Sequence, residues 1–121
     1  MIINIPVSVG ELIDKITILE IKSEFCKNNS QAENINKELV YLRNRLKGAQ
    51  VPDIYYNDLK LINKKLWDLE DLIRKHERLK NFNEEFILCA RLIYMYNDVR
   101  SGIKKEINII MNSEIIEEKI F

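Results

Sequence analysis

Apolar residues recur every three or four positions along most of the chain, and this periodicity predicts four amphipathic helices. The first predicted helix begins near Val9 and ends near Phe25. Ser8 and Glu11 have the spacing of a capping box, and Pro6 favours extended backbone in the residue before it. Apolar residues fall on two sides of this helix, so we expect it to lie between two neighbours.

The second and third predicted helices each carry a narrow apolar seam with alternating steps of three and four residues. We expect a second capping box, Ser30 with Glu33, to start the second helix. The third helix is expected to begin between Asp53 and Asn57 and to run to about His76. A short turn containing Gly48 and Pro52 separates them, which predicts a long antiparallel helical hairpin. Seams this narrow are typical of coiled coils, so we expect the hairpin to pack against a second copy in a homodimer.

The fourth predicted helix, about residues 84–111, has an interrupted seam. Its three central seam positions are polar, namely Asn97, Arg100 and Lys104. Buried polar groups need hydrogen-bonding partners, so we expect other groups to satisfy these three side chains. A second stripe on the same helix stays apolar; it consists of Cys89, Leu92, Tyr96, Val99, Ile103 and Ile110.

These elements predict an all-α fold, a helical bundle of four main helices with one long antiparallel hairpin. The length of 121 residues suits one domain. We therefore expect a single helical domain over residues 1–121, with an extended arm at 1–7 and a C-terminal tail at 113–121. With 3 glycines and 2 prolines, the composition agrees with long helices and few loops.

The chain has 19 basic and 19 acidic residues, so its formal net charge is zero. This balance gives no general attraction to nucleic acids, and we expect no nucleic-acid partner. The apolar run at residues 92–96, which no other run exceeds in length, is far too short to cross a membrane, and no secretory signal is visible. We therefore expect no membrane partner and a cytoplasmic location. Cys26 and Cys89 lack metal-ligand spacing and are expected to be reduced, buried thiols.

Acidic side chains lie among the apolar residues of the first helix. Asp14 and Glu20 fall inside its apolar stripes, where an ionised carboxylate is costly without a cation or several donors. Glu11 and Lys15 lie at the edge of these stripes, where residues four apart can form an ion pair. The first helix therefore needs basic partners from elsewhere in the fold.

The acids of the first helix and the polar positions of the fourth are complementary in charge, which leaves two interpretations open. In the first, Asp14 and one of Glu70 or Asp71 form internal salt bridges to the cations of the fourth helix. In the second, Arg100 and Lys104 line a pocket and bind the carboxylate or phosphate of a small anionic ligand.

The leading hypothesis is a binding or assembly module without catalytic activity, whose polar cluster holds a small anionic ligand or fixes the packing. An alternative is a small metal- or phosphate-dependent enzyme, because Glu11 and Asp14 match one half of the paired acidic motif of all-helical nucleoside triphosphate pyrophosphohydrolases. The preceding half of that motif is absent. No cofactor motif, metal-ligand set or nucleophile motif is present, so we expect no cofactor or metal and assign no catalytic residue. Whether the protein is an enzyme stays open.

Four segments carry a resemblance, together with Lys104 and Asn108: I-P-V-S-V-G-E-L-I-D-K-I-T-I-L-E-I-K at residues 5–22, L-W-D-L-E-D at 66–71, A-R-L-I-Y-M-Y-N-D-V-R at 90–100, and the terminal E-E-K-I-F. The chain resembles a small all-helical bacterial and phage protein family of unassigned function. The resemblance implies these characteristic polar residues: Glu11, Asp14, Lys15, Glu20, Glu70, Asn97, Asp98, Arg100 and Lys104. Together with Asp71 they are our candidate ligand-binding residues. Phe121 departs from the family pattern, in which tyrosine is usual.

Overall fold

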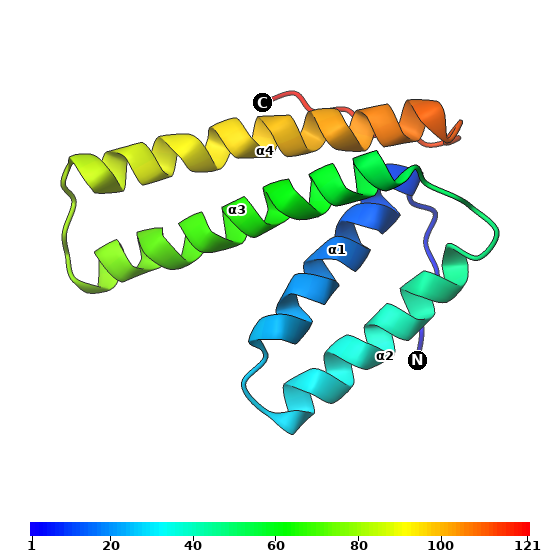
Figure 1. The fold of residues 1–121 in the computed structure, drawn as a ribbon, viewed down its shortest axis with the longest axis horizontal. Coiled ribbons are helices and arrows are strands. Elements are labelled where there is room, and N and C mark those ends of the chain that lie inside the picture. Colours follow the sequence, from blue (N-terminus) through cyan, green and yellow to red (C-terminus); the bar gives the residue numbers. More distant parts are fainter.

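The computed structural model describes residues 1–121, and its regular secondary structure consists of four helices. The helices are α1 (Val9–Phe25), α2 (Asn29–Arg45), α3 (Asp53–Arg78) and α4 (Glu84–Ile110). They pack as an all-α bundle without strands, which confirms the predicted fold class (Figure 1). Residues 1–7 and 113–121 flank the bundle and form neither helix nor strand.

The helix starts follow from side-chain caps. Ser8 caps α1 as predicted, because its Oγ accepts the Glu11 N–H at 3.1 Å. The prediction that Ser30 caps the second helix is wrong. Asn28 Oδ1 accepts the Gln31 N–H at 2.8 Å, and Ser30 lies inside α2. Asparagine and serine are nearly equal as caps, so the spacing of possible partners does not decide between them.

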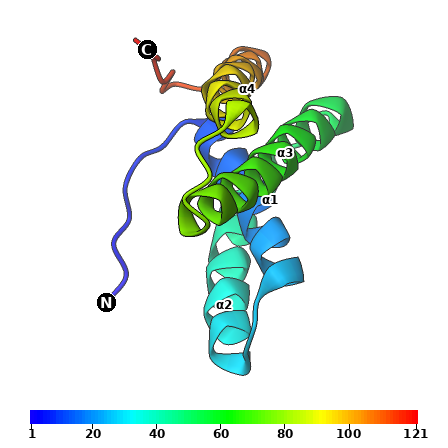
Figure 2. The same ribbon diagram turned by 90° about the vertical axis from the view of Figure 1, so that its left-hand side faces the viewer.

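The long antiparallel hairpin is formed by α3 and α4, which lie side by side in both views (Figure 1, Figure 2). α1 pairs with α2 and also packs against α3 and α4. The prediction that the second and third helices form the hairpin is therefore wrong, since no Cα atoms of α2 and α3 come within 8 Å. The seams of α2 and α3 have matching periods, but both pack against α1, which is apolar on two sides.

Two small apolar clusters hold α1 in the centre of the bundle. The first joins α1 to α3 and α4 and consists of Ile13, Leu59, Ile62 and Ile107. The second joins α1 to α2 and consists of Ile16, Leu19 and Leu39. Burial of a branched aliphatic side chain stabilises a fold by about 1.5–3 kcal/mol. α1 is thus the one helix that packs against all three others.

Both cysteines are free, but only Cys89 is buried. Its Sγ donates to the Leu69 carbonyl oxygen at 3.3 Å, and burial raises the pKa of the thiol. Cys26 is partly exposed because it caps the C-terminus of α1, so the prediction of a buried thiol is wrong for this residue. None of the four helices is both long and apolar enough to cross a membrane.

Candidate functional site

The site begins where the first turn of α1 crosses the last turns of α4. The Gly10 N–H donates to Asn108 Oδ1 at 2.6 Å, and the Val9 N–H donates to Ser113 Oγ at 3.1 Å. A Cβ atom at Gly10 would lie 2.5 Å from the Lys104 carbonyl oxygen. Because a side chain has no room there, glycine allows the two helices to approach closely enough for their polar side chains to meet.

The carboxylate of Asp14 lies at the centre of the site and is 1% exposed. Its Oδ1 accepts a hydrogen bond from Arg100 Nε at 2.9 Å, and its Oδ2 accepts a short one from Arg100 Nη2. Asn63 Nδ2 of α3 also donates to Oδ1, at 2.9 Å. The predicted salt bridge between Asp14 and Arg100 is therefore confirmed, and hydrogen bonding to Asp14 raises the pKa of Arg100. One side chain ties α1 to both α3 and α4.

Thr17 and Asn63 complete the surroundings of Asp14. Asn63 Nδ2 donates to Thr17 Oγ1 at 2.9 Å, and the Thr17 hydroxyl donates to the Asp14 carbonyl oxygen at 2.9 Å. These three side chains are buried, and none of their buried polar atoms lacks a hydrogen-bond partner. The Asp14 carboxylate is thus satisfied by the chain itself, as a buried charge must be.

Lys104 forms the second part of the cluster. Its Nζ donates to Glu11 Oε2 at 2.6 Å and to Glu117 Oε1 at 2.9 Å. The same ammonium group lies 3.8 Å from Asp14 Oδ2. Burial alone would lower the pKa of Lys104, but the hydrogen bonds to Glu11 and Glu117 outweigh it and raise the pKa. Three carboxylates therefore keep this buried ammonium group charged.

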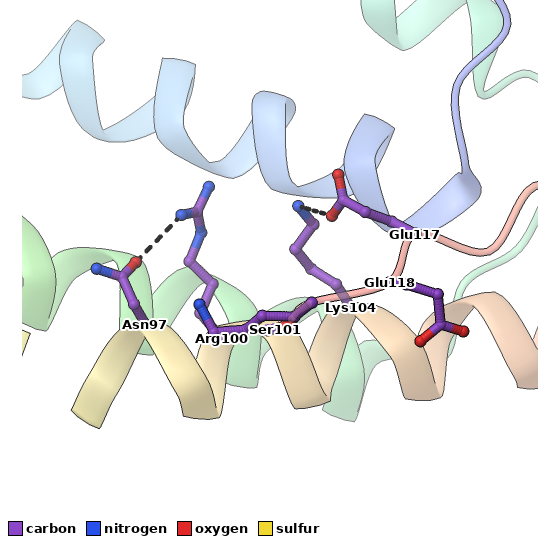
Figure 3. A pocket seen from close by; sticks show the side chains of 7 residues that line it. Asn97, Arg100, Ser101, Lys104, Glu117 and Glu118 are labelled. Carbon is purple, nitrogen blue, oxygen red and sulfur yellow. Dashed lines mark hydrogen bonds and ion pairs between the residues drawn. The ribbon is translucent and has the colours of Figure 1, made fainter. Parts of the chain in front are cut away.

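A polar pocket of about 230 Å³ lies beside the cluster, between α4 and the C-terminal tail (Figure 3). Its lining contains no hydrophobic residue and consists of Asn97, Arg100, Ser101, Lys104, Glu117, Glu118 and Lys119. Asn97 Oδ1 accepts a hydrogen bond from Arg100 Nη1 at 3.3 Å. Figure 3 shows the side chains of Arg100 and Lys104 pointing from α4 toward α1, with Glu117 reaching Lys104 from the tail.

A second concavity, of about 390 Å³, borders part of the same cluster. It is lined by Ile18, Asn63, Leu66, Trp67, Glu70, Arg74, Asn97 and Arg100. The prediction that Glu70 or Asp71 pairs with the cations of the fourth helix is wrong. Glu70 pairs with Arg74 at 3.5 Å, and Asp71 is exposed. The residue of α3 that reaches Asp14 is Asn63, two turns earlier.

Glu20 belongs to a separate cluster where α1, α2 and α3 meet. Its Oε1 accepts from Tyr56 Oη at 2.7 Å and lies 3.5 Å from Lys60 Nζ. Its Oε2 accepts from Arg43 Nη2 at 3.0 Å. Burial alone would raise the pKa of Glu20, but these partners outweigh it and hold the pKa below its ordinary value of 4.5. Burial and the bond to Glu20 raise the pKa of Tyr56.

The variant Glu20→Gln should lose less stability in acid than the parent. Because the pKa of Glu20 is lower in the folded chain than in the unfolded one, its ionised form stabilises the fold above about pH 4.5. That contribution disappears as the pH falls through the folded pKa. Urea unfolding between about pH 5 and about pH 3 should therefore give a flatter profile for the variant. Glu24→Gln, at an exposed position of the same helix, should keep the parent's profile; equal profiles for all three proteins would contradict the expectation.

Two further predicted residues lie on the surface. Lys15 Nζ is 3.7 Å from Glu11 Oε1, which confirms that these residues pair along α1. Asp98 Oδ1 is 3.6 Å from Lys119 Nζ of the tail. The structure thus brings together Glu11, Asp14, Asn97, Arg100 and Lys104. It places Lys15, Glu20, Glu70, Asp71 and Asp98 at the edge of this cluster or apart from it.

Several residues of the site were not among the predicted candidates, including Thr17, Asn63, Asn108 and Glu117. Asn63 follows the seam residue Ile62, and a polar side chain directly beside a seam is the only feature of the sequence that could have indicated its burial. Glu117 lies in a tail without periodicity, and no helical pattern places its carboxylate on Lys104.

Residues 3–121 match the model of one protein family, described as a family of unknown function (DUF6165). The match covers nearly the whole chain, so the protein belongs to this family. No curated protein and no solved structure matches the chain significantly. The expected membership of one family of unknown function is therefore confirmed, and the bacterial or phage origin stays a prediction.

Proposed function

We propose that this small helical protein is a non-catalytic binding module that takes a small anion into the polar pocket beside Lys104. One contact carries the proposal. The carboxylate of Glu117, which is 54% exposed, binds the Lys104 ammonium group where an external anion would bind. Glu117 belongs to the tail, so an anion can replace it without disturbing any helix.

The charges around Lys104 support such an exchange. Asp14 is matched by Arg100, and Glu11 has Lys15 as a second partner. Glu117 is the one carboxylate on Lys104 that comes from a segment without regular structure. Ion pairs between exposed groups contribute only about 0.2–1 kcal/mol. Lys104 is 10% exposed, but it keeps its hydrogen bond to Glu11 when Glu117 leaves. Release of Glu117 therefore costs little, and a bound anion restores the balance of charge.

The pocket favours a small and strongly charged ligand. Its volume of about 230 Å³ lies below the range of about 300–1,000 Å³ that is usual for drug-sized ligands. The Ser101 hydroxyl and the Asn97 amide are neutral donors that can hydrogen-bond anion oxygens next to the Lys104 charge. A phosphate group or a short carboxylate has this chemistry.

Titration with inorganic phosphate, followed by ¹H–¹⁵N NMR, tests the proposal. We expect saturable shifts at Ser101, Lys104 and Glu117, and loss of binding in Lys104→Met. Glu117→Gln removes the internal competitor, so it should bind phosphate about two- to fivefold more tightly than the parent. A structural role of Glu117 alone gives no such gain.

Lys105→Met is the matched control, because it removes the same charge one residue away. Lys105 pairs with Glu118 at 3.3 Å and does not line the pocket. Its phosphate affinity should stay within about twofold of the parent's. Equal losses in Lys104→Met and Lys105→Met, weaker binding in Glu117→Gln, or the absence of saturation would each contradict the proposal.

The alternative, a small metal- or phosphate-dependent enzyme, has no specific observation in its favour. The carboxylates of Glu11 and Asp14 bind Lys104 and Arg100 rather than facing an open site. No group of three or more His, Cys, Asp or Glu side chains is placed to hold a metal ion. We also propose a cytoplasmic location, because free cysteines are typical of a reducing compartment.

A further inference from the structure

We infer that the outer face of α4 binds a second copy of the chain. This surface, the outer stripe, consists of Leu88, Leu92, Met95, Val99, Gly102 and Ile109. Successive members are separated by four, three, four, three and seven residues, which is the spacing of a coiled-coil seam in which Glu106 occupies the one position that the step of seven passes over. The inference is independent of the anion site, because no residue of the outer stripe lines the polar pocket.

The outer stripe has no helix of its own chain to pack against. Among the helices, α4 contacts only α3 and α1. Leu88, Met95 and Val99 are each about half exposed. A Cβ atom added at Gly102 would have no other atom within 4 Å. An open apolar strip therefore runs along α4.

The shape of the hairpin points to a partner of the same kind. In Figure 1 the ends of α3 and α4 that are joined through residues 79–83 extend beyond α1, and Figure 2 shows this end toward the viewer. No Cα atom of α2 comes within 8 Å of a Cα atom of α3 or α4. Helices of 26 and 27 residues thus form a two-helix layer with one side open. Two such hairpins packed together make a four-helix bundle.

The accessible surface is large enough to supply the interface. It measures 8,786 Å², whereas a compact monomer of 14.4 kDa exposes about 6,800 Å². The excess over a compact monomer is larger than the area of about 800 Å² that a stable dimer buries on each chain. The arm and the tail account for part of this excess. The zero net charge removes general repulsion between copies.

The surroundings of the outer stripe favour a second copy over an acidic membrane surface. Arg91 borders the outer stripe, and Glu106 lies within it between Gly102 and Ile109, so neither sign of charge dominates. The sequence predicted a homodimer interface on the seams of the second and third helices, but these seams pack against α1. We therefore assign the interface to the outer stripe, which the fold leaves open.

Sedimentation equilibrium of the full chain tests the inference. The parent should reach twice the chain mass of 14.4 kDa as its concentration rises. Val99→Glu and Met95→Glu place a charge in the interface and should raise the dimer dissociation constant at least about 30-fold. Far-UV circular dichroism should show unchanged helix content, because both side chains are exposed in the monomer.

Val40→Glu is the matched control. It makes the same substitution at a valine that is 58% exposed, against 48% for Val99, on a helix that does not contact α4. Its dissociation constant should stay within about threefold of the parent's. A parent that is monomeric up to about 0.5 mM, near the weak end of protein association, would overturn the inference. A dimer that persists in Val99→Glu would overturn the inference as well. So would a dimer that dissociates in Val40→Glu.

Discussion

The variant Gly10→Ala should be less stable than the parent by about 3 kcal/mol, because its methyl group has no room between α1 and α4. The added Cβ would lie 2.5 Å from the Lys104 carbonyl oxygen and 3.0 Å from Asn108 Oδ1. The first of these atoms is backbone, so α1 must move away from α4. That movement lengthens the Gly10 hydrogen bond to Asn108 and pulls Asp14 away from Arg100.

Gly102→Ala is the control for Gly10→Ala, since it makes the same change on an open face of α4. A Cβ atom there meets nothing within 4 Å, and alanine is about 1 kcal/mol better than glycine inside a helix. Urea unfolding at a concentration that keeps the chain monomeric should show a gain for Gly102→Ala and a loss for Gly10→Ala. Gains in both variants would contradict the close approach of the two helices.

The variant Asp14→Asn should also be less stable by about 3 kcal/mol, which lowers the melting temperature by roughly 12 °C in a domain of this size. The amide keeps the size of the side chain but removes its charge. Its nitrogen takes the place of a carboxylate oxygen that accepts a hydrogen bond from Asn63 or Arg100, so one of these donors loses its acceptor. We place the loss near the lower end for broken buried pairs because Arg100 is 29% exposed and keeps some hydration.

Asp68→Asn is the control for Asp14→Asn. Asp68 pairs with Lys64 at 2.6 Å, but its side chain is largely exposed. Exposed pairs contribute little, so the free energy of unfolding should change by less than about 0.5 kcal/mol. If both variants lost equally little, the Asp14 carboxylate would not be a buried charge that depends on its partners.

The fold could be predicted from the sequence as far as local rules determine it. Helical periodicity predicted the four helices, and the cap at Ser8 predicted where the first one begins. Both signals depend only on residues close together in the sequence. The pairing of helices could not be predicted in the same way. The seams of α2 and α3 have the same period, and only the two-sided burial of α1, seen in Ile13 and Ile16, decides that both seams face α1.

The site was predicted where a charge interrupts an apolar face. Asp14, Arg100 and Lys104 were found in this way, because a buried charge stands out against a helical period. Asn63 and Glu117 were missed for different reasons. An uncharged amide beside a seam is a weak signal, and a residue in an irregular tail has no period to interrupt.

The structure divides the polar cluster into two parts with different roles. Asp14, Arg100 and Asn63 form a buried joint that holds α1 on α3 and α4, and every partner there belongs to a helix. In the account proposed above, Lys104 and Glu117 form the exchangeable part, because the carboxylate comes from the tail. Under the proposed function, we expect the joint to keep Lys104 in place when an anion replaces Glu117.

A double-mutant cycle on Asp14 and Arg100 tests the buried joint most directly. The free energies of unfolding are measured for the parent, Asp14→Asn, Arg100→Met and the double variant at a concentration that keeps the chain monomeric. We expect a coupling energy of about 2 kcal/mol, because each single change leaves the other partner unpaired. A coupling energy below about 0.5 kcal/mol, with losses that simply add, would contradict the claim that this pair joins α1 to α4.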